Sequence, residues 1–393
     1  MVKIVLYTNT ISPHQLPLAK ELAARVGDDN FRYIYTEVAD KDHGGLGWTL
    51  DVPDWCVHAS DADANEWLEN AEMILVGGLR PIGLCERRAA SGKTTLYMSE
   101  RWFKPPVGMF RLLCPSYRRM AERFVRLLDV CGLVYLPIGI YAARDMARLY
   151  GLIHGDWRCL FRAPELEFEK KPGGKVWLKN EPRNTQSTRK YCLDKMRMWG
   201  YFVEPSKFTG QNSQTENTDD NPKTQTQDFK LKTLRVLWVG RLLKIKRVDT
   251  IIRAVGELSR TRSNSNLQLQ LDIYGTGPEE DRLKKLSANY GDIINFYPPV
   301  PIDEVRKLMR EHDIYVLASN AYEGWGAVVS EALEEGMMAI GTYEAGSTAT
   351  LLPNSNLFHS GDWKGLLKLL QKDIPSVDIG DWSARKSAEV IDV

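Results

Sequence analysis

The strongest constraint on the fold is a regular alternation of short apolar runs with amphipathic ones, present in both halves of the chain. In the first half the apolar runs read as buried strands at 3–9, 31–38, 72–78 and 94–100. A strand followed by a helix returns to its sheet as a parallel neighbour, so the pattern predicts a parallel sheet with helices on both faces. The alternation restarts further on and predicts a second set of strands at 234–240, 267–275, 293–300, 314–319 and 337–342.

A polar stretch separates the two halves. Residues 206–233 are rich in Gln, Asn, Thr and Asp, so they cannot bury enough surface to order themselves, and we interpret them as a flexible linker. A chain of 393 residues is also too long for one ordinary core. We therefore expect an α/β protein with a Rossmann-like domain over 1–205, a second over 234–375, and a final segment over 376–393. Two doubly wound domains in tandem predict a ligand cleft between their strand carboxyl ends.

The first helix carries its own start and stop signals. Ser12 and Gln15 fit a capping box, and Pro13 suits the first helical position. A glycine suits the other end. We therefore predict a helix over 12–27, with His14 at its N-terminus.

Composition and charge narrow the function classes. The formal net charge is +1, so no global charge favours nucleic acid, and we expect no nucleic-acid partner. The six cysteines form no Cys-x-x-Cys pair, which favours a reducing compartment and argues against metal binding by them. The N-terminus reads as a strand rather than a signal peptide. The longest near-apolar run, 131–143, is shorter than the roughly 20 residues that a membrane-spanning helix needs. We expect a cytoplasmic protein.

A basic loop follows the first strand of the second half. Gly240 ends this strand, and Arg241 and Lys246 lie between it and the next predicted helix. Backbone N–H groups and a helix N-terminus favour anions at such a position, and the guanidinium adds a fork of donors. The loop suits a phosphate group, but a solvated basic turn would have the same composition. Gly275 and Gly277 form a second strand–glycine turn, which alone indicates only positive φ.

Two glutamates stand eight positions apart in the stretch YEGWGAVVSEALEEG (322–336). On one continuous helix Glu323 and Glu331 would lie about 12 Å apart and roughly 80° around the axis, which suits neither a metal ion nor a carboxylate pair. We predict instead that Glu323 lies in the glycine-rich turn and Glu331 in the following helix. Such separated acceptors fit two ends of an extended ligand, with the N–H groups of Gly324 and Gly326 near phosphate between them. The alternative is an ordinary amphipathic helix with exposed acids, which we expect of the last two acids of the stretch.

In this order the motifs resemble the donor-binding domain of retaining GT-B glycosyltransferases, in particular the large family four (group 1). That family's pattern is G-R-x(4)-K, then G-x-G-P, then E-x(7)-E. The chain has Gly240-Arg241 with Lys246, Gly275-Thr276-Gly277-Pro278, and Glu323 with Glu331. The resemblance covers about 234–362, including a later loop at 341–352 that ends in Gly before a short helix.

The resemblance implies a GT-B fold, with an acceptor-binding first domain and a second domain that binds a nucleotide-sugar donor, UDP- or GDP-linked. It implies that Arg241 and Lys246 hold the diphosphate, that Glu331 hydrogen-bonds the ribose, and that Glu323 contacts the transferred sugar. Arg241, Lys246 and Glu323 would be the catalytic residues, with no metal ion or other cofactor. The remaining implied donor contacts are Gly275, Gly277, Gly324, Trp325 and Gly326.

The first half resembles the family only in layout. Many relatives have a Gly-Gly turn after the first strand, where this chain has NTISPHQ with His14. Many also have a His after the strand that corresponds to 94–98, where this chain has Ser99, Glu100 and Arg101. We therefore take His14, Glu100 and Arg101 as candidates for the acceptor side.

The segment between Arg80 and Arg126 is basic, with eleven Lys and Arg against three acids and with aromatic residues interleaved. Such a surface would suit anionic lipid headgroups or a lipid-diphosphate-linked glycan, and would make the protein peripheral on the inner face of a membrane. A solvated basic face over core aromatics fits equally well.

The sequence therefore predicts a retaining glycosyltransferase that moves a sugar from a nucleotide diphosphate to a glycan or lipid-linked glycan, as in the biosynthesis of a bacterial surface polysaccharide. In this family the departing phosphate serves as the base for the acceptor hydroxyl. A sugar-phosphate or epimerase-type GT-B enzyme is the second enzymatic hypothesis. The alternative from another class is a non-catalytic GT-B subunit that binds nucleotide or glycan for a partner enzyme. Such a subunit would have no reason to keep all four of Arg241, Lys246, Glu323 and Glu331.

Overall fold

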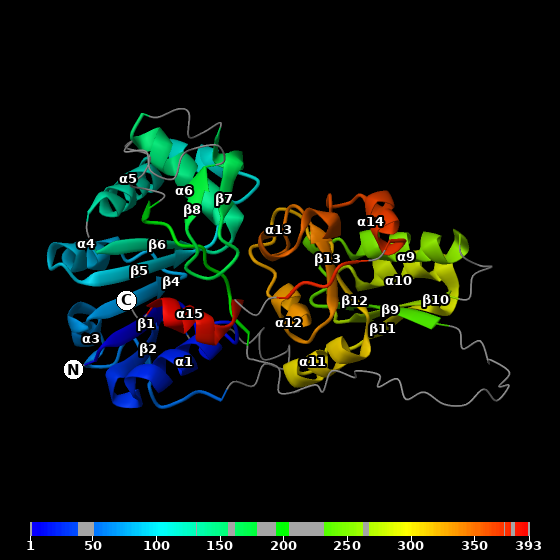
Figure 1. The fold of residues 1–393 in the computed structure, drawn as a ribbon, viewed down its shortest axis with the longest axis horizontal. Helices are drawn as coiled ribbons and strands as arrows, with labels where there is room; N and C mark the ends of the chain where they lie inside the picture. Colours follow the sequence, from blue (N-terminus) through cyan, green and yellow to red (C-terminus); the bar gives the residue numbers. More distant parts are fainter. Residues whose placement is uncertain are drawn as a thin grey trace, which may run out of the picture.

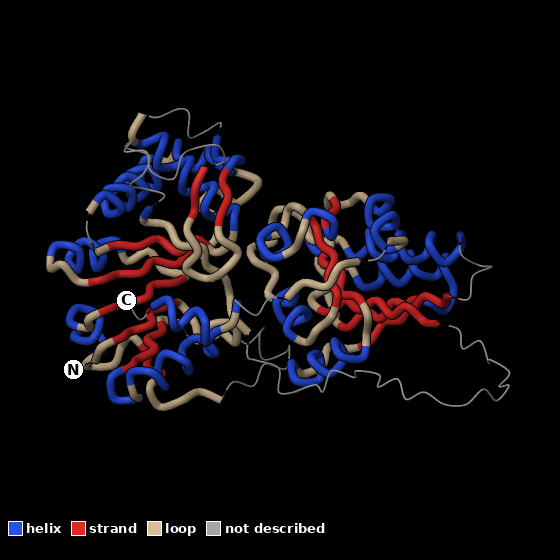
Figure 2. Tube along the Cα trace, in the orientation of Figure 1, coloured by secondary structure: helices blue, strands red, loops and turns tan. Residues whose placement is uncertain are grey.

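Two parallel sheets, each with helices on both faces, lie side by side in the computed structural model (Figures 1 and 2). The structure describes residues 2–37, 51–130, 132–155, 162–178, 194–203, 232–261, 267–372, 374–378 and 382–391. This is the α/β class predicted from the alternation, with two Rossmann-like sheets. The proposed linker, 206–233, lies outside the described residues except for its last two, which begin the second sheet.

The first sheet has the strand order β3-β2-β1-β4-β5-β6, and its paired strands are all parallel. The order reverses beside β1, as it does in doubly wound folds. Its strands are β1 (Ile4–Thr8), β2 (Phe31–Tyr35), β3 (Cys56–His58), β4 (Met73–Gly77), β5 (Thr94–Ser99) and β6 (Leu133–Pro137). Its helices are α1 (Leu16–Val26), α3 (Ala64–Asn70), α4 (Ile82–Ala90), α5 (Pro115–Asp129) and α6 (Ile140–Ile153). An antiparallel hairpin follows, made of β7 (Leu166–Phe168) and β8 (Val176–Leu178).

The second sheet repeats this plan in the order β11-β10-β9-β12-β13-β14, again with parallel pairs. Its strands are β9 (Lys232–Val239), β10 (Leu267–Tyr274), β11 (Ile294–Tyr297), β12 (Ile314–Leu317), β13 (Met338–Thr342) and β14 (Leu357–Phe358). Its helices are α9 (Val248–Thr261), α10 (Glu280–Ser287), α11 (Ile302–Glu311), α12 (Val328–Glu334), α13 (Gly346–Leu351) and α14 (Trp363–Leu370). Every residue of β12 is buried, because helices cover both faces of a parallel sheet and favour continuous apolar strands.

The first helix begins later than its capping signals predicted. It starts at Leu16 and has no side-chain cap, so the predicted capping box is wrong. The Gln15 side chain instead accepts a hydrogen bond from the Tyr33 hydroxyl at 3.0 Å, and the Ser12 hydroxyl accepts from the backbone N–H of His14 at 3.2 Å. His14 therefore lies in the turn that connects β1 to α1.

The aromatic residues of the basic segment mostly belong to the core. Tyr97, Trp102, Phe103 and Phe124 are buried in the first domain. Arg88 is fully buried too, and its guanidinium donates to backbone carbonyls that follow α3 and begin β5. For this part of the segment the core interpretation is the right one.

The strand carboxyl ends of the two sheets face each other. Loops that follow β6 contact loops that follow β12 and β13. The backbone N–H of Ile140 donates to Thr350 Oγ1 at 3.1 Å, and the Tyr141 hydroxyl donates to the carbonyl of Tyr343. A Cβ on Gly139 would lie 3.1 Å from the Trp325 ring. In doubly wound folds this edge is where ligands bind.

The chain returns to the first domain after completing the second. Helix α15 (Ala384–Ile391), red in Figure 1, packs on the blue α1. The Arg25 guanidinium lies 3.6 Å from the Glu389 carboxylate. Just before α15, the Trp382 ring lies 6.4 Å from that of Trp325.

Candidate functional site

An ion pair between Lys246 and Glu323 lies at the carboxyl edge of the second sheet. Lys246 Nζ is 2.5 Å from Glu323 Oε2, and the Ser319 hydroxyl donates to the same oxygen at 2.8 Å. Lys246 belongs to the turn after β9 and Glu323 to the turn after β12, and these strands are neighbours. The sheet therefore brings together two side chains that are 77 positions apart.

Arg241 lies five residues before Lys246, on the loop after β9. Close contacts of two glycines hold the backbone of this loop. Arg241 itself is exposed. A Cβ on Gly275 would lie 1.8 Å from the carbonyl oxygen of Gly240, and one on Gly277 would lie 2.6 Å from that of Leu242. The two glycines let the loop after β10 pack on the loop after β9, so in the described structure they position the basic loop.

Glu331 lies within α12, as the separation of the two glutamates predicted, and it is also buried. The residue is 5% exposed, and its Oε1 lies 3.7 Å from His14 Nδ1 of the first domain. Burial raises the pKa of Glu331 to about 7, with the positive charge of Arg306 opposing the shift. Burial also lowers the pKa of His14 to about 4. Removal from water disfavours the charged form of each group, which moves an acid and a base in opposite directions.

The acid at the end of α12 is not the exposed residue that we expected. The Glu335 side chain is 1% exposed and forms ion pairs with Arg306 at 2.5 Å and Arg310 at 2.6 Å. Both arginines come from α11, which packs beside α12. Glu335 therefore joins two helices.

Glu100 reaches from the first domain to the glycine-rich turn of the second. Its Oε1 accepts from the Tyr201 hydroxyl at 3.2 Å, and its Oε2 accepts from Lys104 Nζ. A Cβ on Gly324 would lie 2.6 Å from both carboxylate oxygens. Gly324 therefore admits the Glu100 carboxylate against the backbone next to Glu323.

Arg101, in contrast, turns toward α6. Its Nε lies 3.4 Å from the carboxylate of buried Asp145, and its guanidinium stacks 5.1 Å from the centre of the Tyr141 ring. Burial raises the pKa of Asp145, and the positive charge of Arg101 opposes this. Of the acceptor-side candidates, the structure brings His14 and Glu100 to the residues of the second domain and places Arg101 at one side.

Trp325 does not point its side chain at the charged cluster. The residue is 2% exposed, and its ring packs against Gly139, Gly200 and Trp382. A Cβ on Gly200 would lie 2.9 Å from this ring. In the described structure the indole therefore makes a contact between the domains, and a donor contact of Trp325 stays a prediction. The neighbouring Gly326 has φ +84°, which a side chain would strain.

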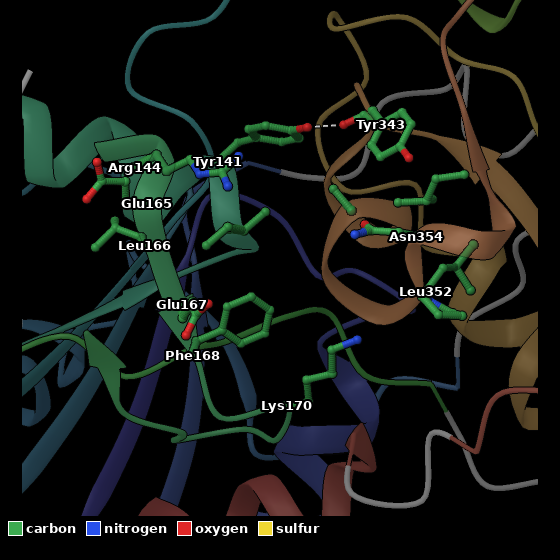
Figure 3. Close-up of a pocket in the computed structure, with 14 residues that line it drawn as sticks. Tyr141, Arg144, Glu165, Leu166, Glu167, Phe168, Lys170, Tyr343, Leu352 and Asn354 are labelled. Atoms are coloured by element: carbon green, nitrogen blue, oxygen red, sulfur yellow. Dashed lines mark hydrogen bonds between the residues drawn. The ribbon is translucent and has the colours of Figure 1, made fainter. Parts of the chain in front are cut away.

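A cavity of about 580 Å³ opens between the domains beside the Tyr141–Tyr343 hydrogen bond. Figure 3 shows the Tyr141 side chain reaching from the wall formed by the first domain toward Tyr343. The charged side chains that line the cavity come from the first domain, and they are Arg144, Glu165, Glu167 and Lys170. The wall of the second domain is mostly apolar and includes Tyr343 and Asn354. Gly346, three residues after Tyr343, donates its backbone N–H to the carbonyl of Gly324 at 3.1 Å, so the loop that carries Tyr343 also contacts the glycine-rich turn.

Two features are absent from the described residues. No group of three or more His, Cys, Asp or Glu side chains there could hold a metal ion. No helix there has both the length and the apolar character needed to cross a membrane.

Two Rossmann-like domains that face each other through their strand carboxyl ends have the architecture of the GT-B fold. Residues 219–373, about two fifths of the chain, match the family model described as glycosyl transferases group 1.

Curated relatives match part of the chain. A D-inositol 3-phosphate glycosyltransferase of Pseudarthrobacter chlorophenolicus is 28% identical over 156 residues, which is 38% of this chain and 37% of the relative. The GtfA subunit of a UDP-N-acetylglucosamine–peptide N-acetylglucosaminyltransferase of Streptococcus pneumoniae is 29% identical over 32% of this chain and 25% of the relative. The alignments thus span about a third of these relatives or less.

Solved structures resemble the whole chain. A trehalose-6-phosphate structure from E. coli with bound UDP-2-fluoro glucose has a TM-score of 0.55 at 11% identity, covering 99% of this chain and 94% of that one. Anabaena HepE in complex with UDP has a TM-score of 0.52 at 12% identity, with coverage of 99% and 94%. At such identities the likeness shows the fold alone.

Proposed function

We propose that this protein is a retaining glycosyltransferase that moves a sugar from a nucleotide diphosphate to a hydroxyl of a glycan or lipid-linked glycan. The observation that carries the proposal is the Lys246–Glu323 ion pair beside Arg241, on the sheet edge that faces the first domain. The group 1 family match of the second domain supports a nucleotide-sugar donor. We further propose that the reaction takes place in the cytoplasm, during the assembly of a bacterial surface polysaccharide.

The donor is proposed to lie along the edge of the second sheet. Arg241 and Lys246 would bind the diphosphate, and Glu331 would accept hydrogen bonds from the ribose hydroxyls. Glu323 would then exchange part of its contact with Lys246 for the hydroxyls of the sugar. The backbone N–H groups of Gly324 and Gly326 would approach the phosphates between these two ends of the donor.

The reaction breaks the bond between the anomeric carbon and the β-phosphate oxygen, and the electron pair stays on that oxygen. The acceptor hydroxyl forms the new bond from the same face and gives its proton to the departing phosphate. Negative charge grows on the leaving diphosphate, and preorganised donors stabilise it. The loss of one such donor typically costs ~10²–10³ in rate. We propose that Arg241 and Lys246 supply this stabilisation without a further cofactor, so that EDTA leaves the rate unchanged.

A donor screen tests the proposal. Thermal shift with UDP-, GDP-, ADP- and CMP-sugars identifies the nucleotide, because a ligand at a hundredfold excess over Kd stabilises the folded state by about 2.7 kcal/mol. Release of nucleoside diphosphate from the best donor then measures turnover. NMR of the product should show the donor's anomeric configuration.

The variant Lys246→Ala should lose activity, and Glu323→Gln should lose it with less effect on nucleotide binding. A matched control is the exposed pair of Glu304 and Lys307 on α11, which lie 3.5 Å apart. Its variants Glu304→Gln and Lys307→Ala should behave as wild type. If wild type binds a nucleotide but turns over no donor, the alternative of a non-catalytic GT-B subunit holds instead.

A further inference from the structure

Exposed apolar side chains gather on one short loop of the first domain. Eight large hydrophobic side chains are exposed among the described residues, and four of them lie between 107 and 113. Phe110 is 74% exposed and Leu113 is 78% exposed, and the other two are Val107 and Met109. This apolar loop (107–113) contains the 3-10 helix η2 (Gly108–Leu113) and leads into α5. Soluble surfaces rarely expose apolar groups in clusters unless the cluster binds something.

The loop is held in place from both ends. On one side Trp102 is buried in the core, and on the other Tyr117 donates its hydroxyl to the Trp102 carbonyl at 2.9 Å. The Arg80 guanidinium lies 5.1 Å from the Trp102 ring and 5.4 Å from the Tyr117 ring. The apolar side chains are therefore presented by an anchored support.

Basic residues flank the apolar loop on both sides in the sequence. Residues 101–121 contain five Lys and Arg and no acid. Arg119 on α5 is exposed, and Arg111 lies within the loop. Apolar side chains flanked by basic ones are complementary to a bilayer with anionic headgroups. The apolar side chains can enter the boundary with the acyl chains, and the basic side chains can stay among the phosphates.

The basic surface begins at the candidate site. Lys104 pairs with Glu100, whose carboxylate lies against Gly324 of the second domain. From these observations we propose that the apolar loop and its flanking arginines bind the surface of an anionic lipid bilayer. Bound in this way, the protein holds the first-domain side of its site near the lipid headgroups.

Vesicle co-sedimentation tests this without any sugar donor, so its outcome is independent of the proposed transfer reaction. The purified full chain should pellet with vesicles of phosphatidylcholine and phosphatidylglycerol, and not with phosphatidylcholine alone. The bound fraction should fall as salt rises, because screening weakens attraction to the charged surface. A wild-type protein that stays in the supernatant with anionic vesicles would overturn the proposal.

Two pairs of variants separate the apolar and the basic contributions. Phe110→Ser with Leu113→Ser should lower the partition coefficient by on the order of tenfold or more, since both side chains would leave the bilayer boundary. The matched control is Val52→Ser with Tyr297→Ser, which removes two exposed apolar side chains elsewhere. Arg111→Gln with Arg119→Gln should weaken binding and reduce its salt dependence.

The basic pair has its own control in Arg253→Gln with Lys285→Gln, two exposed positions of the second domain. Equal binding by the Phe110/Leu113 variant and wild type, at equal Tm, would refute the role of the loop. Loss of a wild-type dimer in that variant, seen by size exclusion, would show instead that the loop joins two copies of the chain.

Discussion

His14 and Glu331 approach to 3.7 Å across the seam between the two domains, and the same burial moves their pKa values to about 4 and about 7. Between these two values both side chains favour their neutral forms. The contact is therefore stable as an uncharged one in mildly acidic solution, and it acquires a negative charge as the pH rises through neutrality.

Glu331→Gln should stabilise the protein more at pH 8 than at pH 5. The folded-state pKa of this carboxyl is about 7 and its ordinary value is 4.5, so the cost of ionising it in the folded state grows between these values and is constant above them. The raised pKa lowers the free energy of unfolding of wild type by at most about 3 kcal/mol above neutral pH. Urea unfolding of both proteins at the two pH values measures it. The exposed acid Glu304 supplies the control, and a pH-independent gain for Glu331→Gln would contradict the burial argument.

His14→Gln should remove part of the acid sensitivity of the fold. The folded-state pKa of His14 is depressed below its ordinary 6.5, so the neutral ring contributes stability that is fully present above 6.5 and is lost as pH falls toward 4. Wild type should therefore lose more stability than the variant between pH 7 and pH 4.5. Exposed His359 serves as the control position. Parallel stability curves for wild type and His14→Gln would count against this explanation.

Gly275→Ala should destabilise the second domain by at least about 2 kcal/mol, because the new Cβ meets a carbonyl oxygen and the backbone has positive φ. The predicted approach is 1.8 Å, at φ +147°. Gly92→Ala is the matched control, since it has φ +68° but nothing within 4 Å, and it should cost only about 1 kcal/mol. Denaturant midpoints measure both. Equal losses would mean that the loop after β10 can shift away from the loop after β9.

Trp325→Ala should cost about 3–5 kcal/mol, as expected for removal of a large buried ring. Trp325→Phe should cost less, because the indole Nε1 has no hydrogen-bond partner among the described residues and its loss leaves nothing unpaired. Partly exposed Trp363 provides the comparison through Trp363→Ala. If Trp325→Ala lost nucleotide affinity at unchanged stability, the indole would be a donor contact after all.

Residues whose role depends on local spacing could be predicted from the sequence. The separation of Glu323 from Glu331 indicated a turn followed by a helix, and the structure has both. The alternation of strands and helices likewise predicted two parallel sheets. The roles of these glutamates in binding stay predictions.

Residues whose role depends on distant partners could not be predicted. Trp325 sits among small residues that suggest an open loop, and only the approach of Gly139 and Gly200 makes it a core side chain. Tyr201 and Asp145 were missed for the same reason, since each acts on a residue far away in the sequence. The near-apolar run 131–143 contains β6 and the start of α6, two elements that its composition alone does not distinguish.

The return of α15 to α1 makes the second domain an insertion within the first. The chain passes from the first domain to the second after residue 203 and returns before α15, so the domains are joined at two places. Deleting 384–391 would uncover the side of α1 on which α15 packs, and would thus loosen the first domain. The last helix is, in this sense, the final piece of the first domain.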